Sequence, residues 1–90
     1  MAGPRYIADP ESMIRRVELD GLTALFHIPS GMTHIVAPPA PQILRALAGA
    51  PADADELARR LSFNFDLEGG AEAMAARLAE LEAAGLVRHA

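Results

Sequence analysis

The most informative part of the sequence is Leu25-Phe26-His27-Ile28-Pro29-Ser30-Gly31-Met32-Thr33-His34-Ile35-Val36. Two runs rich in β-branched and apolar residues flank a Pro-Ser-Gly turn signal, a pattern typical of a β-hairpin. The rest of the chain contains three segments with helical spacing. The order therefore predicts a sheet first and helices after it.

One further strand extends this hairpin into a predicted three-stranded antiparallel sheet. A strand at residues 16–19 ends at Asp20-Gly21, a strong two-residue hairpin signal. The central strand runs from Leu22 or Thr23 to Ile28, and its alternation predicts that one of its two faces belongs to the core. The third strand spans residues 33–37 and stops at Pro38-Pro39, because proline has no N–H to donate.

The turn of the second hairpin allows two registers. A two-residue Ser30-Gly31 loop places Phe26 opposite Ile35 and His27 opposite His34. A Pro29-Ser30 type I turn with Gly31 in a bulge instead places Phe26 opposite His34, and the two histidines then lie on different faces. We favour the first register because it pairs apolar with apolar residues.

Three helices are predicted, and each combines start and stop signals with an apolar stripe. The first starts near Pro41, the second follows the capping pair Asp53 and Glu56, and the third runs from about Gly70 to Ala84. Their stripes are Ile43, Leu44 and Leu47; Leu57 and Leu61; and Met74, Leu78 and Leu81. An irregular connector is expected over residues 63–67. Together these elements predict an α+β, winged helix-turn-helix-like domain.

Length and composition set the class of protein. Ninety residues predict a single domain over residues 1–90, with residues 1–15 as a loose N-terminal arm. The chain has no cysteine, which excludes disulfides and a thiolate nucleophile. The sequence shows neither an apolar signal-peptide run nor a membrane span, so we expect a soluble cytoplasmic protein with no membrane partner.

The distribution of charge argues against nucleic acid as a partner. The formal net charge is −4, and the predicted third helix carries Glu72, Glu80 and Glu82 against Arg77 alone. DNA binding needs a basic recognition helix because phosphate neutralisation supplies much of the affinity.

Side chains with catalytic or metal-binding chemistry are few. His27 and His34 face each other in the favoured register, but two ligands do not make a zinc site, and His89 lies near the end of the sequence. Ser30 sits in a turn with no evident reason to be near a base. We therefore expect no enzymatic activity, no metal and no cofactor.

The open edge of the third predicted strand is the best candidate site. An edge strand exposes unpaired N–H and C=O groups to which a peptide can add as another strand. The ladder would be Thr33, His34, Ile35, Val36 and Ala37, and the third helix would supply a floor from Met74, Arg77, Leu78 and Leu81. Leu78 is more simply explained as a core residue. A homodimer through the same edge is an alternative that the sequence leaves open.

Several segments resemble the PqqD-like family, nearest to its branch named for the HPr-rel-A system, over roughly residues 16–88. The segments that carry the resemblance are Leu25-Phe26-His27, Ser30-Gly31, Thr33-His34-Ile35-Val36, Gln42-Ile43-Leu44-Arg45-Ala46-Leu47, Asp55-Glu56-Leu57-Ala58-Arg59-Arg60-Leu61 and Leu78-Ala79-Glu80-Leu81-Glu82-Ala83-Ala84-Gly85-Leu86-Val87. The chain departs from its relatives at Ala37-Pro38, where they often have Asn-Pro.

The resemblance implies a bacterial recognition domain for ribosomally made, modified peptides. Such a domain holds the leader segment of a precursor peptide along its third strand and third helix. It presents that peptide to a modifying enzyme, which for PqqD is a radical-SAM protein. The predicted function is thus that of a peptide chaperone without catalysis, and the alternative is a winged-helix DNA-binding or protein-assembly module.

Overall fold

The hairpin sheet is the first of two sheets in the computed structural model, which describes residues 3–62 and 70–90. It consists of β2 (Ile14–Leu19), β3 (Leu22–His27) and β4 (Met32–Val36), antiparallel and in that order. Asp20 and Gly21 form the first turn with positive φ angles of 29° and 87°, as an Asp-Gly hairpin turn requires. The three predicted strands are confirmed with shifted ends: β2 begins two residues earlier than expected, and β4 ends at Val36, so Ala37 of the predicted ladder lies outside the strand.

A second sheet corrects the prediction of a loose N-terminal arm. It contains β5 (Ala52–Asp53), β1 (Arg5–Ala8) and β6 (Val87–His89), with β1 in the centre and antiparallel to both neighbours. Tyr6 and Ala8 of β1 are buried. No local turn signal indicates this sheet, because the partners of residues 5–8 lie more than 40 residues away in the sequence. A short 3-10 helix, η1 (Glu11–Met13), joins the two sheets.

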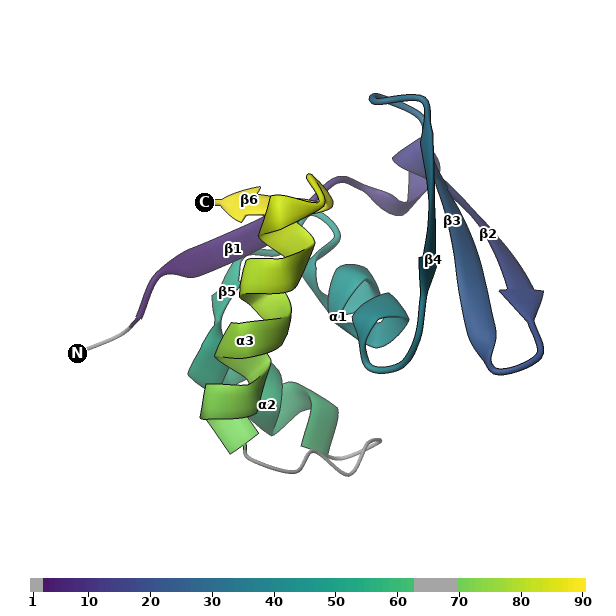
Figure 1. The fold of residues 1–90 in the computed structure, drawn as a ribbon. Coiled ribbons are helices and arrows are strands. Elements are labelled where there is room, and N and C mark those ends of the chain that lie inside the picture. The colour runs from purple at the N-terminus through teal and green to yellow at the C-terminus, as the bar shows by residue number, and fades with distance from the viewer. Residues whose placement is uncertain (1–2, 63–69) are drawn as a thin grey trace.

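Three helices follow the first sheet, as predicted: α1 (Ala40–Leu47), α2 (Ala54–Ser62) and α3 (Gly70–Ala83). The Asp53 carboxylate accepts the N–H of Glu56 at 2.8 Å, so the predicted cap of α2 is present. Figure 1 shows α1 between the hairpin sheet and α3. The predicted connector at residues 63–67 lies outside the described residues. The fold is α+β, with two antiparallel sheets.

The core is made largely by the predicted helical stripes together with the second sheet. The fully or nearly fully buried apolar residues are Tyr6, Ala8, Ile14, Leu25, Ile43, Leu44, Leu47, Ala52, Leu57, Met74, Leu78, Leu81, Leu86 and Val87. Leu61 is only partly buried against this cluster. None of the helices in the described residues is long and apolar enough to cross a membrane.

The second hairpin adopts neither of the two predicted registers. His27 pairs with Met32, Leu25 with His34 and Phe26 with Thr33, so the loop has four residues, 28–31. The N–H of Gly31, at φ +71°, donates to the His27 carbonyl at 2.8 Å. The shift from the favoured register is an even number of residues, so His27 and His34 still share a face. The pairing of Phe26 with Ile35 is wrong.

The buried face of the hairpin sheet is the more polar of its two faces. Thr23, Leu25 and His27 of β3 are buried, while Leu22 and Phe26 on the other face are exposed. The buried face lies toward α1 (Figure 1), and His27 keeps hydrogen-bond partners there. Tertiary contacts therefore bury the face of β3 that the polarity of its side chains alone would leave in solvent.

Candidate functional site

β4 is an edge strand among the described residues, and its open edge can be resolved to individual backbone groups. In the two-residue hairpin between β2 and β3, the closing pair of Leu19 and Leu22 is hydrogen-bonded. Alternation along β3 then directs the backbone groups of Thr23, Leu25 and His27 toward β4. The backbone groups of their partners in β4 point toward β3. The N–H and C=O groups of Thr33 and Ile35 therefore point away from β3.

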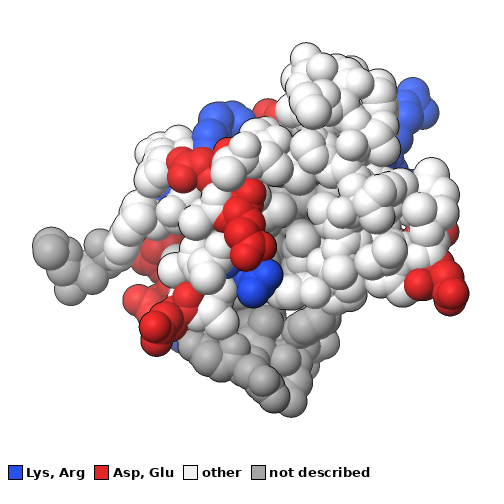
Figure 2. Space-filling model, in the orientation of Figure 1, with Lys and Arg blue, Asp and Glu red and all other residues white. Residues whose placement is uncertain are grey.

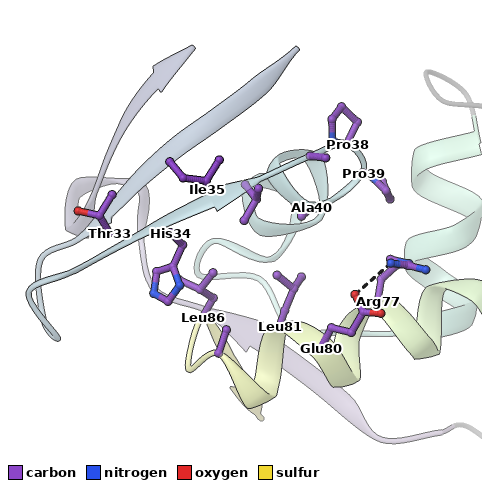
Figure 3. Close-up of a pocket in the computed structure, with 13 residues that line it drawn as sticks. Thr33, His34, Ile35, Pro38, Pro39, Ala40, Arg77, Glu80, Leu81 and Leu86 are labelled. Carbon is purple, nitrogen blue, oxygen red and sulfur yellow. Dashed lines mark hydrogen bonds and ion pairs between the residues drawn. The ribbon is translucent and has the colours of Figure 1, made fainter. Parts of the chain in front are cut away.

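A cavity of about 590 Å³ lies between this edge and α3. Its walls are residues 33–40 on one side and Arg77, Glu80, Leu81, Ala84 and Leu86 on the other. Figure 3 shows His34 pointing across the cavity toward Leu86, while Ile35 extends from the opposite side of the strand. We call this space the β4–α3 groove.

The groove has an apolar floor and one ion pair. Leu81 and Leu86 are nearly fully buried, so their exposed atoms form a shallow apolar base. Arg77 Nη1 donates to Glu80 Oε2 at 3.0 Å, and both side chains are about half exposed or more. In this structure the Arg77 guanidinium therefore already has an acidic partner, although the pair contributes little in such an exposed setting.

The structure places seven of the nine predicted site residues along the groove: Thr33, His34, Ile35, Val36, Ala37, Arg77 and Leu81. Met74 and Leu78 do not line it, because their side chains are 1% and 0% exposed and belong to the core. The expectation that Met74 lines a pocket is wrong. Met74 lies one helical turn before Leu78 in α3, on the apolar stripe that packs into the core.

Sequence reasoning missed several groove residues: Pro38, Pro39, Ala40, Glu80, Ala84 and Leu86. A signal existed for two of them, since Glu80 and Ala84 follow Arg77 and Leu81 at three-residue spacing on one helical face. The others come from the segment after β4 and the end of α3, which only the folded chain brings together.

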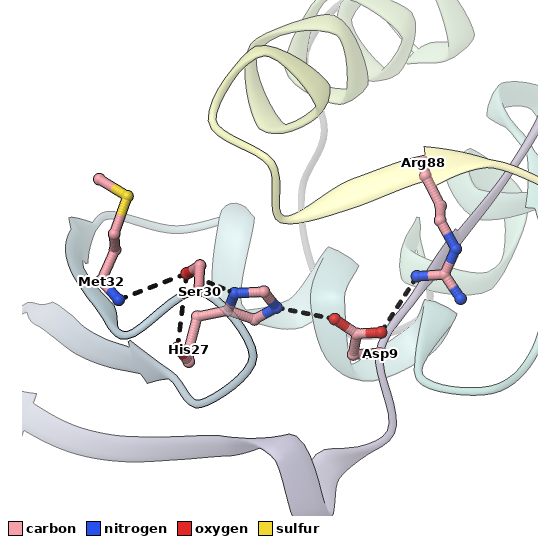
Figure 4. Close-up of polar contacts among 5 residues, drawn as sticks. All are labelled: Asp9, His27, Ser30, Met32 and Arg88. Carbon is pink, nitrogen blue, oxygen red and sulfur yellow. Dashed lines mark hydrogen bonds and ion pairs between the residues drawn. The ribbon is translucent and has the colours of Figure 1, made fainter.

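A chain of hydrogen bonds beside the second hairpin was also missed. His27 Nδ1 lies 2.7 Å from Ser30 Oγ, and His27 Nε2 lies 2.7 Å from Asp9 Oδ2. Arg88 donates to the other Asp9 oxygen at 3.0 Å (Figure 4). Ser30 is therefore next to a base, contrary to the sequence-based expectation. His27 uses its two ring nitrogens for these partners rather than facing His34 as a ligand pair.

Electrostatics fix the roles within this chain. The hydrogen bond from His27, followed by that from Arg88 and the charges of both, holds the pKa of Asp9 below its ordinary value, although partial burial opposes the shift. Ionised Asp9 can only accept, so His27 Nε2 carries a proton. Nδ1 accepts the Ser30 hydroxyl when the imidazole is neutral, and donates to Ser30 Oγ when it is protonated.

Serine, imidazole and carboxylate in this order are the groups that nucleophilic hydrolases use. Here, however, Ser30 Oγ also accepts the Met32 N–H at 3.3 Å, and Ser30 does not line the groove. The chain of bonds joins the hairpin to β6 and to the segment after β1, which makes it a structural tie. Within the described residues no cluster of three metal-ligating side chains occurs.

Comparisons of the chain with protein-family models, curated proteins and solved structures found no match.

Proposed function

We propose that this chain is a peptide-binding module of the PqqD-like type that holds an extended segment against the edge of β4. The observation that carries the proposal is the pair of outward-facing backbone groups at Thr33 and Ile35, which lie beside an open groove. A peptide strand pairing there gains a net ~0.5–1.5 kcal/mol for each hydrogen bond. The domain itself performs no chemistry in this proposal and presents the peptide to a modifying enzyme.

Side chains of the bound peptide would supply selectivity. Alternate residues of an added strand point to the same side, so every second side chain meets the floor at Leu81 and Leu86. An acidic peptide side chain reaches Arg77 only by sharing or displacing Glu80. We therefore expect apolar side chains to contribute more than acidic ones.

We also propose that the fold is of the winged helix-turn-helix type. That fold is compatible with an alternative function as a DNA-binding or protein-assembly module. The charges of α3 do not favour DNA. Its acids Glu72 and Glu80 are exposed and Glu82 is half-buried, while its one basic residue, Arg77, pairs with Glu80. Phosphate contacts on this helix would meet repulsion.

Titration of the ¹⁵N-labelled full chain with peptides encoded next to its gene tests the proposal. Peptides from the N-terminal segments of the neighbouring enzymes belong in the set. We expect amide shifts confined to residues 33–37 and to the α3 face that lines the groove. A duplex DNA that binds with an affinity falling steeply with salt, with no shifts from any peptide, would favour the alternative.

A further inference from the structure

The hairpin sheet presents an apolar face to solvent on the side opposite the core. We define the outer face as Arg15, Val17, Leu19, Leu22, Ala24, Phe26, Thr33 and Ile35, which share one side of β2, β3 and β4 by strand alternation and register. Its five large apolar side chains are between 38% and 58% exposed. Figure 1 shows α1 on the other side of this sheet and no described element over the outer face.

The pairing register makes these side chains contiguous. Val17, Ala24 and Ile35 form one row across all three strands, and Leu19 lies opposite Leu22 in the next row. Met13 and Ile28, both exposed, extend the same alternation beyond Arg15 and Phe26. Every exposed large hydrophobic side chain in the described part of the chain lies in this sheet or directly next to it. Such clustering marks an interaction surface.

The size of the patch fits a protein–protein interface. Together with Met13 and Ile28, the five large side chains of the outer face expose roughly 600 Å² of mostly apolar surface, the upper end for the largest patch of a typical monomer. A standard interface buries about 800 Å² on each partner, of which up to ~65% is apolar. The outer face therefore supplies enough apolar area for one partner of a stable complex.

The charges at the two ends of the face are complementary under a two-fold rotation. Arg15 lies near the start of β2, and Asp20 lies in the turn at its end. Neither side chain forms a hydrogen bond or ion pair with another described residue. Figure 2 shows uncharged surface over the sheet, with a basic group near the start of β2 and an acidic group near the β2–β3 turn. A rotation that reverses the strands brings Arg15 toward Asp20 of the partner subunit.

We propose that two copies of this chain pack outer face to outer face as a two-fold dimer. The two sheets would then form a sandwich with a spacing of about 10 Å, in which the row of Val17, Ala24 and Ile35 lies at the centre. Thr33 and Ile35 belong to both surfaces, but their backbone groups face the β4–α3 groove while their side chains belong to the outer face, so each copy keeps its groove accessible. The dimer does not depend on the peptide-binding proposal.

Sedimentation equilibrium of the full chain tests the dimer, with Val17→Lys as the disrupting variant and Val17→Thr as its control. Val17 is 58% exposed, so a lysine there leaves the core intact but buries a charge in the proposed interface. We expect the wild type to dimerise, Val17→Lys to raise the dimer Kd on the order of 100-fold, and Val17→Thr to raise it far less. A wild type that stays monomeric, or a dimer indifferent to Val17→Lys, overturns the proposal.

A second measurement is independent of any disrupting variant. The chain has no cysteine, so Ala24→Cys introduces a single thiol at the centre of the outer face, and Ala75→Cys places one on the exposed surface of α3. A bismaleimide linker that spans the sheet spacing should cross-link two Ala24→Cys chains efficiently and leave Ala75→Cys chains unlinked. Equal yields for the two variants would contradict packing through the outer face.

Discussion

His27 Nε2 lies 2.7 Å from Asp9 Oδ2, and this contact ties the hairpin sheet to the chain that follows β1. His27 is 6% exposed, so the bond is largely shielded from water. Arg88 of β6 holds the second carboxylate oxygen, and one side chain thereby connects both sheets. The position of the hairpin, and with it the β4 edge, depends on this polar tie.

Acid should weaken the tie at Asp9. The pKa of Asp9 in the folded chain lies below its ordinary value of 3.8, so its contribution to stability is complete above that value and is lost as pH falls through the folded-state pKa. Asp9→Asn removes this contribution at every pH. Urea unfolding should therefore show wild type more stable than Asp9→Asn at neutral pH, with the difference shrinking below about pH 4. A difference that is independent of pH would contradict this role.

Loss of the Ser30 hydroxyl should loosen the second hairpin. Ser30→Ala leaves His27 Nδ1 without its partner at 2.7 Å, and we expect the free energy of unfolding to fall by about 1 kcal/mol. Ser30→Thr keeps the hydroxyl and is the matched control. Chemical denaturation of both variants measures the difference, and equal stabilities would show that the bond contributes nothing.

Removal of one outward N–H from β4 should weaken peptide binding without unfolding the chain. Ile35→Pro and Ile35→Ala both lose an exposed side chain, but only the proline removes the N–H that faces the groove. We expect Ile35→Pro to bind a peptide identified by the NMR titration about fivefold to tenfold more weakly than Ile35→Ala, from a loss of ~1–1.4 kcal/mol. Calorimetric titration of the folded variants provides the comparison.

Val36→Pro should behave differently from Ile35→Pro. The backbone of Val36 faces Thr23 in β3, and its side chain packs partly against the core. The proline therefore breaks a ladder bond inside the sheet, and we expect a cooperative loss of stability visible by circular dichroism. A folded Val36→Pro chain would show that our assignment of inward and outward residues in β4 is wrong.

Substitutions at Met74 and Arg77 should have very different effects on the free energy of unfolding, because one side chain is buried and the other lies on the surface of α3. Met74→Ala opens a cavity in the core and should lower the free energy of unfolding by about 2–5 kcal/mol. Arg77→Ala removes only an exposed ion pair and should change it by less than ~0.5 kcal/mol. Thermal or urea unfolding checks both, and similar losses would contradict the burial assigned to these residues.

Much of the fold could be predicted because its signals are local. Asp20-Gly21 can close a tight hairpin, Asp53 can cap α2, and Met74, Leu78 and Leu81 form one helical stripe regardless of what surrounds them. The candidate edge at residues 33–37 followed from the same local reading. Whether the groove beside it binds a peptide stays a prediction.

Local spacing and backbone geometry account for the order of β2, β3, β4 and the three helices, and for the residues of most apolar stripes. Long-range contacts instead place residues 5–8 in a second sheet, give the hairpin loop four residues, and leave Leu22 and Phe26 in solvent while His27 is buried. The Asp9 carboxylate, for example, contacts His27 and Arg88, which lie 18 and 79 residues away from it in the sequence. The free energy of such long-range contacts outweighs the local polarity of the sequence in deciding which residues are buried. A prediction from local patterns does not include these contacts.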